Sequence, residues 1–276
     1  MGPGGRAPRR ALVVGTIEVA RDDPRLVPYR SLADPEALVK AGLFVAEGRL
    51  VVRRLIEGRR FALHSILVTH AAAESLTDVL APIAERTPIV VVPQAAMNDI
   101  VGFNIHRGCL SLAERPLVPT LSSAHLADAR RVLVLEGVNN PDNVGGLFRS
   151  AAAFGVELVV VGPACSDPLY RKAIRTSMAA TLRVPFVLAG PWPDALETLR
   201  ANGVTILALT PGRDAIALDG MRHEVAKVAI LVGAEGAGLS SEALARADHT
   251  VRIPIAADVD SLNVIVAASI ALHHYR

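Results

Sequence analysis

Cysteines are scarce in this sequence: the chain of 276 residues contains only Cys109 and Cys165. Neither belongs to a CxxC pair or lies near a histidine at the spacing of metal ligands, so a structural zinc site is not expected. No stretch approaches the roughly 18 uninterrupted apolar residues that would span a bilayer. The basic start MGPGGRAPRR precedes an apolar segment that Gly15 and Glu18 interrupt, which does not fit a signal peptide. These absences predict a cytoplasmic protein without a bound metal.

The phosphate-binding loops of common nucleotide enzymes are also missing. The sequence has neither a GxGxxG motif nor a GK[ST] motif, so neither NAD nor ATP is indicated. The net charge of +2 neither requires nor excludes a nucleic-acid partner. Only three of the 29 basic residues are lysines. Arginine suits phosphate because its planar fork can bind two oxygens at once, but a GC-rich genome would produce the same bias. Composition therefore leaves the ligand open.

The length and the hydrophobic content of 51% predict two well-packed domains, at about 150 residues for each domain. Residues 1–29 are expected to be a flexible tail or irregular segment, whose arginines could alternatively contact a polyanion. Residues 30–115 would form a smaller α/β domain and residues 128–276 a larger one. Pro116 and Pro119 mark residues 116–127 as a linker between them.

The larger domain repeats a strand–loop–helix pattern. Four apolar, β-branched runs each close on glycine or proline: RVLVLEGV, VELVVVGP, GVTILALTPG and KVAILVGAEG. Helical stretches lie between them, which predicts an α/β fold with a parallel sheet covered on both faces. In the smaller domain, Asp34 and Pro35 predict a helix start, residues 49–55 a helix, and HSILVTH and TPIVVVPQ two strands. Because ligands bind at the carboxyl ends of parallel strands, the loops after the four runs are the candidate site.

The loop after the first of these runs leads to an arginine on an apolar helix. In PDNVGGLFRSAAAF, Asn143 is predicted to be the N-cap of a helix that ends near Phe154. Arg149 lies at the edge of the core stripe and leans toward Gly145, so we expect open space for its guanidinium beside Gly145 and Gly146. Two interpretations remain open: an arginine that only extends to solvent, or a functional cation at the strand end.

Two further motifs are ordinary when each is taken alone. In ILVGAEGAGLS, Glu235 is the only charge among three glycines, and the segment also fits a tight turn before a helix capped by Ser240 or Ser241. In VDSLNVIVAAS, either Asp260 or Ser261 can cap a helix. Asn263 would then lie in the first turn of that helix, where its side chain can project into a site.

The three motifs together resemble the signature motifs of the SpoU/TrmH family of SPOUT RNA ribose methyltransferases, which are N-x-G-x-x-x-R, G-x-E-x-x-G-L-S and I-P … S-L-N-V. They stand here at residues 143–149, 233–240, and 253–254 with 261–264. The segment SDPLYRKAIRTSMAATLRVPF is similar to the family's connecting region. FVAEGRLVVRRLIEG and SILVTH resemble its amino-terminal, ribosomal-protein-like substrate-binding domain. The resemblance runs from about residue 40 to the end of the chain.

The resemblance implies a fold, a cofactor and a partner. The fold is a parallel sheet whose carboxyl-terminal segment forms a deep trefoil knot, an exception to the general absence of knots. The cofactor is S-adenosylmethionine, and the chain forms a homodimer with RNA as substrate. Four positions depart from the family pattern by small or apolar exchanges, and they concern the cofactor loops and the choice of substrate: Ala179, Ile255, Ala257 and Ile265.

The resemblance also assigns roles to individual residues. The catalytic set is Asn143, Arg149, Glu235, Ser261 and Asn263. The cofactor contacts are Leu209, Thr210, Gly233, Ile253 and Leu262. Contacts to RNA phosphates are expected from the amino-terminal domain, although a solvated charged face is the alternative for each of Arg53, Arg54, Arg59, Arg60 and Arg107.

The expected reaction is transfer of a methyl group from the cofactor to a ribose 2′-hydroxyl, with no metal. Arginine stays protonated in proteins, so we expect Arg149 to hold a phosphate or the developing alkoxide while the proton leaves to water or a neighbouring acceptor. The added domain favours 23S rRNA as substrate, including methylation that confers resistance, and tRNA is the alternative. A noncatalytic RNA-binding protein on the same fold and a nucleotide-dependent enzyme are the rivals, and the intact polar set and the missing phosphate loops argue against them.

Overall fold

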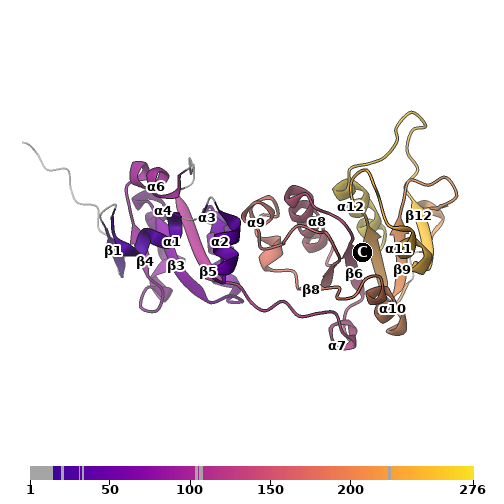
Figure 1. The fold of residues 1–276 in the computed structure, drawn as a ribbon, viewed down its shortest axis with the longest axis horizontal. Helices are drawn as coiled ribbons and strands as arrows, with labels where there is room; N and C mark the ends of the chain where they lie inside the picture. The colour runs from indigo at the N-terminus through magenta and orange to yellow at the C-terminus, as the bar shows by residue number, and fades with distance from the viewer. Residues whose placement is uncertain are drawn as a thin grey trace, which may run out of the picture. The chain divides into compact units, whose positions relative to one another are not determined.

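The computed structural model describes residues 15–19, 22–30, 32, 34–102, 105, 108–222 and 225–276. The chain divides into two compact units, with the boundary between Arg115 and Pro116 (Figure 1). No helix among these residues is long and apolar enough to cross a membrane. The same residues contain no group of three or more His, Cys, Asp or Glu that could hold a metal ion.

The first unit is built on a mixed five-stranded sheet in the order β1-β4-β3-β5-β2. β1, β4 and β3 are parallel, and β5 is antiparallel to both β3 and β2. The strands are β1 (Thr16–Glu18), β2 (Leu43–Glu47), β3 (Leu63–Val68), β4 (Ile89–Val91) and β5 (Cys109–Glu114). The helices are η1 (Pro24–Leu26), α1 (Val27–Arg30), α2 (Pro35–Lys40), α3 (Arg49–Gly58), α4 (His70–Ser75), α5 (Thr77–Leu80), η2 (Ala81–Ile83) and α6 (Gln94–Val101).

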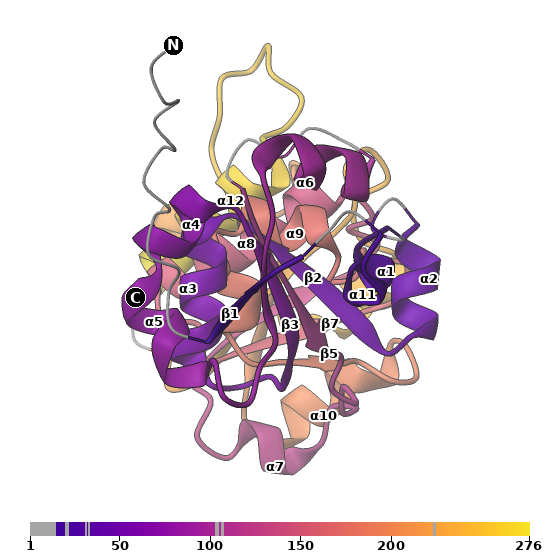
Figure 2. The same cartoon turned by 90° about the vertical axis from the view of Figure 1, so that its left-hand side faces the viewer.

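Helices cover both faces of this sheet, with α1 and α2 on one side and α3, α4 and α5 on the other (Figure 2). The predicted helix start is confirmed, because the side chain of Asp34 accepts hydrogen bonds from the backbone N–H groups of Glu36 and Ala37. The two predicted strands are β3 and β4. β1, β2 and β5 were not predicted.

The interpretation of residues 1–29 as a flexible or irregular segment is wrong for Thr16–Glu18 and for the described residues 22–29. β1 extends the sheet by pairing with β4, and Leu26 and Tyr29 are completely buried. The hydroxyl of Tyr29 forms a 2.9 Å hydrogen bond with the hydroxyl of the buried Ser65. These contacts join residues that are far apart in the sequence, so a local sequence pattern cannot predict them. Residues 1–14 lie outside the described residues.

The second unit contains a seven-stranded sheet in the order β10-β12-β9-β11-β6-β7-β8, and every neighbouring pair is parallel. The strands are β6 (Arg131–Leu135), β7 (Leu158–Val161), β8 (Phe186–Leu188), β9 (Thr205–Leu209), β10 (Ile216–Ala217), β11 (Val228–Val232) and β12 (His249–Arg252). The four predicted apolar runs are the neighbouring strands β9, β11, β6 and β7. The predicted α/β fold with a parallel sheet is therefore confirmed.

Side chains alternate between the two faces of this sheet, as the pleat of a strand requires. Leu133 and Leu135 of β6 pack in one core with helices α8 (Pro141–Ala153) and α12 (Val264–His274). Val132 and Val134 pack in a second core with α7 (Ser123–Leu126), α10 (Asp194–Ala201) and α11 (Ser241–Arg246). The remaining helices are α9 (Arg171–Thr176), η3 (Ala180–Leu182) and η4 (Leu218–Gly220). Both faces are covered.

The predicted linker, residues 116–127, is too long. Leu188 of β8 donates its backbone N–H to the carbonyl of Pro119, and its own carbonyl accepts from the N–H of Leu121. Leu126 on α7 is 0% exposed within the core of the second unit. The prolines therefore mark the start of the connection between the units. The residues from Pro119 to Leu126 belong to the second unit, because they pair with β8 and contribute Leu126 to its core.

Candidate active site

The loops that follow β12, β9, β11 and β6 meet at one edge of the parallel sheet. These strands are consecutive neighbours, so their carboxyl ends lie side by side. Leu209 ends β9, and the backbone N–H of Thr210 donates to the carbonyl of Val251 on β12. Gly233 directly follows β11, and Ile253 directly follows β12. Four of the five residues predicted to contact a cofactor are thus at the same edge.

The fifth residue, Leu262, comes just before α12 and is half-buried. The start of α12 lies near the same edge, since Asn263, directly before it, donates a hydrogen bond to Glu235 in the loop after β11. This region therefore presents apolar side chains and backbone groups at the strand ends. Such groups suit a ligand with an uncharged heterocycle and a short aliphatic chain.

The loop of residues 233–240 is a tight turn. Ala234 and Gly238 form an antiparallel bridge with two backbone hydrogen bonds. An added Cβ at Gly233 would collide with the backbone of Gly238, so this close approach requires glycine. Glu235 lies in the turn between Ala234 and Gly238, and its side chain is exposed. Ser240 ends the loop and is the N-cap of α11, as one of the two predicted alternatives states.

Glu235 and Asn263 are brought together although they are distant in the sequence. Asn263 donates from Nδ2 to Glu235 Oε1 at 2.8 Å, and its Oδ1 accepts from the backbone N–H of Ile265 at 2.9 Å. Asn263 is therefore the N-cap of α12. The prediction that Asp260 or Ser261 caps this helix is wrong, because Asn263 occupies the cap position and both residues lie in the preceding loop.

The start of α8 also differs from the prediction. The N-cap is Asn140, whose Oδ1 accepts from the backbone N–H of Asp142 at 2.9 Å. Pro141 occupies the first helical position, where its missing N–H costs nothing. Asn143, the predicted cap, lies instead in the first turn and is 6% exposed. Its amide is therefore buried at the strand-end edge.

Gly145 and Gly146 do not leave open space for Arg149. An added Cβ at Gly145 would lie 2.7 Å from the carbonyl oxygen of Ala173 on α9, and one at Gly146 would collide with the side chain of Ile265 on α12. The glycines allow α9 and α12 to approach α8 closely. A 2.7 Å hydrogen bond between the hydroxyls of Ser150 and Ser269 also joins α8 to α12.

Arg149 lies on the outer side of α8 and is exposed. Within the described residues, its guanidinium forms no hydrogen bond or ion pair, including with Glu235, Ser261 or Asn263. The contact between Gly146 and Ile265 places α8 beside the first turn of α12, two residues after Asn263. Arg149 is therefore on the helix next to the Glu235–Asn263 pair, but it is not part of that pair.

The connecting segment anchors the first turn of α8. Lys172 Nζ lies 2.8 Å from Asp142 Oδ2, and the hydroxyl of Thr176 donates to Asp142 Oδ1 at 2.9 Å. The hydrogen bond from Lys172, followed by that from Thr176, lowers the pKa of Asp142 below its usual value. Ala179, where the family pattern has glycine, is completely buried and has a left-handed φ of 67°.

Glu136 is a residue that the motifs did not mark. It directly follows β6 and is only 7% exposed, and its carboxylate accepts hydrogen bonds from Trp192 and Ser240. The sequence signal that could have found it is a carboxylate that closes an apolar run, since a charged residue at such a buried position needs partners.

The arginines predicted to bind RNA in the first unit have different surroundings. Arg53 on α3 donates to both carboxylate oxygens of Asp78, at 2.5 and 2.9 Å, and also lies 3.5 Å from Glu57. Arg54 is half-buried on the same helix. Arg59 is exposed and ends α3 with a left-handed φ of 50°.

Arg60 and Arg107 complete the predicted RNA-binding set. The guanidinium of Arg60 lies 6.0 Å from the ring centroid of Phe61, and partial burial lowers its pKa. Arg107 lies outside the described residues. The guanidinium of Arg53 is thus bound by carboxylates, whereas the side chain of Arg59 is exposed.

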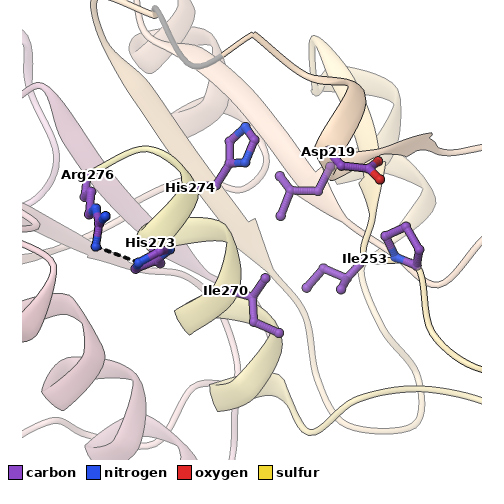
Figure 3. Close-up of a pocket in the computed structure, with 8 residues that line it drawn as sticks. Asp219, Ile253, Ile270, His273, His274 and Arg276 are labelled. Atoms are coloured by element: carbon purple, nitrogen blue, oxygen red, sulfur yellow. Dashed lines mark hydrogen bonds between the residues drawn. The ribbon is translucent and has the colours of Figure 1, made fainter.

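A cavity of about 500 Å³ lies beside the carboxyl-terminal half of α12 (Figure 3). Arg276 and His273 form a 2.6 Å hydrogen bond at one side of it. Ile253 is the only member of the predicted cofactor set that lines this cavity, so it is mostly separate from the predicted site. The lining residues are Leu218, Asp219, Ile253, Pro254, Ile270, His273, His274 and Arg276.

In open parallel α/β sheets, ligands bind in the loops at the carboxyl ends of the strands, which is where this chain brings its polar motif residues together. Residues 130–273 match the SpoU rRNA Methylase family. An uncharacterised tRNA/rRNA methyltransferase of Mycobacterium bovis is 40% identical over 260 residues, which cover 91% of this chain and 88% of that protein. The chain therefore belongs to the SpoU rRNA methylase family.

Other relatives and solved structures are similar over different lengths. The 23S rRNA (guanosine(2553)-2′-O)-methyltransferase RlmP of Bacillus subtilis is 32% identical over 151 residues, covering 55% of this chain and 60% of RlmP. The AdoMet-bound rRNA methyltransferase from Sinorhizobium meliloti superposes with a TM-score of 0.81 at 23% identity, covering 95% of this chain and 98% of that chain. The SpoU methyltransferase AviRb from Streptomyces viridochromogenes, in complex with AdoMet, has a TM-score of 0.75 at 20% identity, with 92% and 97% coverage. These similarities show that the chain has the fold of these structures.

Proposed function

We propose that this protein is an S-adenosylmethionine-dependent methyltransferase that acts on a ribose 2′-hydroxyl of RNA, with 23S rRNA as the favoured substrate and tRNA as the alternative. The observation that carries the proposal is the hydrogen bond between Glu235 and Asn263, which joins two distant motifs at the strand-end edge. Family membership and the ribose specificity in the name of RlmP support it.

The cofactor supplies an electrophilic methyl group on a sulfonium. Leu209, Ile253 and Leu262 would provide apolar walls for it, and the backbone at Thr210 and Gly233 would provide hydrogen bonds, which fits a molecule with an adenine and an aliphatic chain. AdoMet in the S. meliloti and AviRb complexes supports the same cofactor. These loops would hold the cofactor beside the ribose hydroxyl, and positioning of this kind supplies much of the acceleration of a group transfer.

Arg149 supplies the positive charge that the reaction needs. The cofactor would supply the methyl group to the 2′-oxygen, and the hydroxyl proton would leave to water or a neighbouring acceptor. The guanidinium holds an RNA phosphate or the developing alkoxide. Asn143, Glu235, Ser261 and Asn263 orient the ribose.

The active form is a homodimer in the cytoplasm with a carboxyl-terminal trefoil knot. Support for the dimer comes from α12, which is apolar from Val264 to Leu272 except for Ser269, although Val266 and Ile270 are 46% and 40% exposed. A helix of this kind is normally buried on all sides. The first unit is the substrate-binding domain, related to ribosomal proteins, and Arg59 is its exposed candidate for a phosphate contact.

Mapping of 2′-O-methyl groups tests the proposal. RNA from cells with and without this protein is compared, and the purified protein is titrated with S-adenosylmethionine by calorimetry. We expect one or a few rRNA positions to lose methylation in the deletion strain, and the cofactor to bind the purified chain. If cofactor binds but every 2′-O-methyl position is unchanged, the ribose specificity is wrong. If no cofactor binds, the proposed activity is wrong.

A further inference from the structure

Glu136 connects three loops at the carboxyl edge of the large sheet. Its Oε1 accepts a 2.6 Å hydrogen bond from the indole N–H of Trp192, in the loop after β8, and another of 2.6 Å from the hydroxyl of Ser240. Its Oε2 accepts from the backbone N–H of Ser240 at 2.9 Å. Glu136 itself follows β6, and its backbone N–H donates to the carbonyl of Val232 on β11.

The donors around Glu136 require a carboxylate. The hydroxyl of Ser240 accepts from the backbone N–H of Ala243, so its own hydrogen is available for Glu136. Three hydrogens therefore point at two oxygens that have no hydrogen to offer. Glutamine has the same size but only one oxygen, so its NH₂ would face either the indole N–H of Trp192 or the backbone N–H of Ser240. Buried bonds to a charged acceptor are also stronger than bonds to a neutral one.

These bonds fix one end of the loop that carries Glu235. The loop runs from Gly233 to Ser240 and is closed across its middle by the bridge between Ala234 and Gly238. Glu235 then accepts from Asn263, the N-cap of α12. Displacement of Ser240 would therefore move the turn, and with it the contact between Glu235 and Asn263.

We propose that Glu136 is a positioning residue that holds residues 233–240 in the geometry needed for cofactor binding and methyl transfer. This inference rests on the function proposed above. Glu136 lies behind the loop and acts through Ser240 and Trp192, so it touches neither the cofactor nor the ribose.

The test compares Glu136→Gln with a control at Glu157, an exposed carboxylate that directly precedes β7 and acts on the other end of β6. Glu157 accepts from the backbone N–H groups of Arg130 and Arg131, so it holds the amino end of β6 with the same kind of bond, on the opposite edge of the sheet. Glu157→Gln removes charge-assisted bonds without touching the loop. In full-length protein, we measure hydrogen exchange of residues 233–240, cofactor affinity by calorimetry, and the kcat and KM of transfer to rRNA.

We expect E136Q to accelerate exchange in this loop and to weaken cofactor binding, each about tenfold, as the loss of a buried hydrogen bond to a charged group implies. The kcat of transfer should fall. The KM for RNA should change less than about twofold, because independent sites affect each other by only about 0.3–0.5 kcal/mol. E157Q should leave all of these unchanged. The indole N–H signal of Trp192, the only tryptophan, should move upfield in E136Q because its short bond to a carboxylate is lost.

Equal loop exchange in E136Q and E157Q, or unchanged cofactor affinity and kcat in E136Q, would overturn the inference. If E136Q does not fold, Ser240→Ala is used instead. It removes the hydroxyl donor, and with it the side-chain cap of α11, but keeps the backbone N–H, and should show the same changes in the loop to a smaller degree. If the natural protein binds no cofactor, the proposed function fails, while loop exchange and the indole signal still decide whether Glu136 holds the loop.

Discussion

Arg53 in the first unit and Arg149 in the second unit are both predicted to meet RNA, and both lie on helices, but their surroundings differ. Arg53 binds Asp78 with two hydrogen bonds and lies near Glu57. Arg149 is exposed and has no such partner among the described residues. A guanidinium that is already occupied joins two helices, whereas one without an intramolecular partner is available to an anion from outside. Both residues are arginines, so the difference in their expected roles comes from the neighbouring side chains.

The largest expected effect comes from Arg149→Ala. Removing a positioned positive charge that stabilises the transition state should lower kcat at least about 100-fold, as the loss of one oxyanion-stabilising donor does. Cofactor affinity should stay within about threefold, because no apolar wall of the predicted cofactor site is changed. Single-turnover transfer and calorimetry measure the two quantities. Arg53→Ala is the control, and a loss of transfer in R53A as large as in R149A would remove the contrast between the two arginines.

The contrast is sharpened by comparing Arg59→Ala with Arg53→Ala in RNA binding. Arg59 is exposed at the end of α3, so its loss should weaken RNA binding about threefold and reduce the slope of log affinity against log salt by about one. Arg53→Ala should leave that slope unchanged. It should instead lower the midpoint of urea unfolding, because the link from α3 to Asp78 is lost.

Affinity measured at several salt concentrations, with unfolding followed in parallel, separates these outcomes. A change in the salt slope for R53A would mean that its ion pair opens to bind phosphate.

The smallest expected effect concerns Asp142, which pairs with Lys172 on the helix beside α8. The folded-state pKa of Asp142 is lowered by Lys172 and then by Thr176, so the pair stabilises the fold above the usual pKa of 3.8 and loses its effect as the pH falls through the folded pKa. Asp142→Asn should therefore cost stability near neutral pH, by less than about 1 kcal/mol because the carboxylate is half-exposed and screened.

The difference between D142N and the natural protein should shrink as the pH falls below 3.8, in urea unfolding followed across this range. A difference that is constant with pH would show that the loss of the ion pair with Lys172 is not its cause, since asparagine can still accept the hydrogen bond from Thr176.

Several elements were predictable because their signals are local. The four apolar runs predict four neighbouring parallel strands, and Asp34 and Ser240 cap helices as their positions indicate. The cap at Asn140 was also accessible, since Pro141 marks the first helical turn. β10 and β12 were not accessible in this way. Both are short, at Ile216–Ala217 and His249–Arg252, and they depend on pairing with distant strands: β10 pairs with β12, and β12 pairs with β9.

The sequence by itself determined the class of fold, the edge of the sheet where polar loops gather, and the residues that enter those loops. These follow from periodicity and turn chemistry, which act within a few residues. The tertiary structure alone decided that Gly145 and Gly146 admit α9 and α12, that Arg53 is paired while Arg149 is not, and that Glu136 holds a loop. Each of these depends on which groups distant in sequence come within hydrogen-bond or van der Waals range, and packing sets that choice.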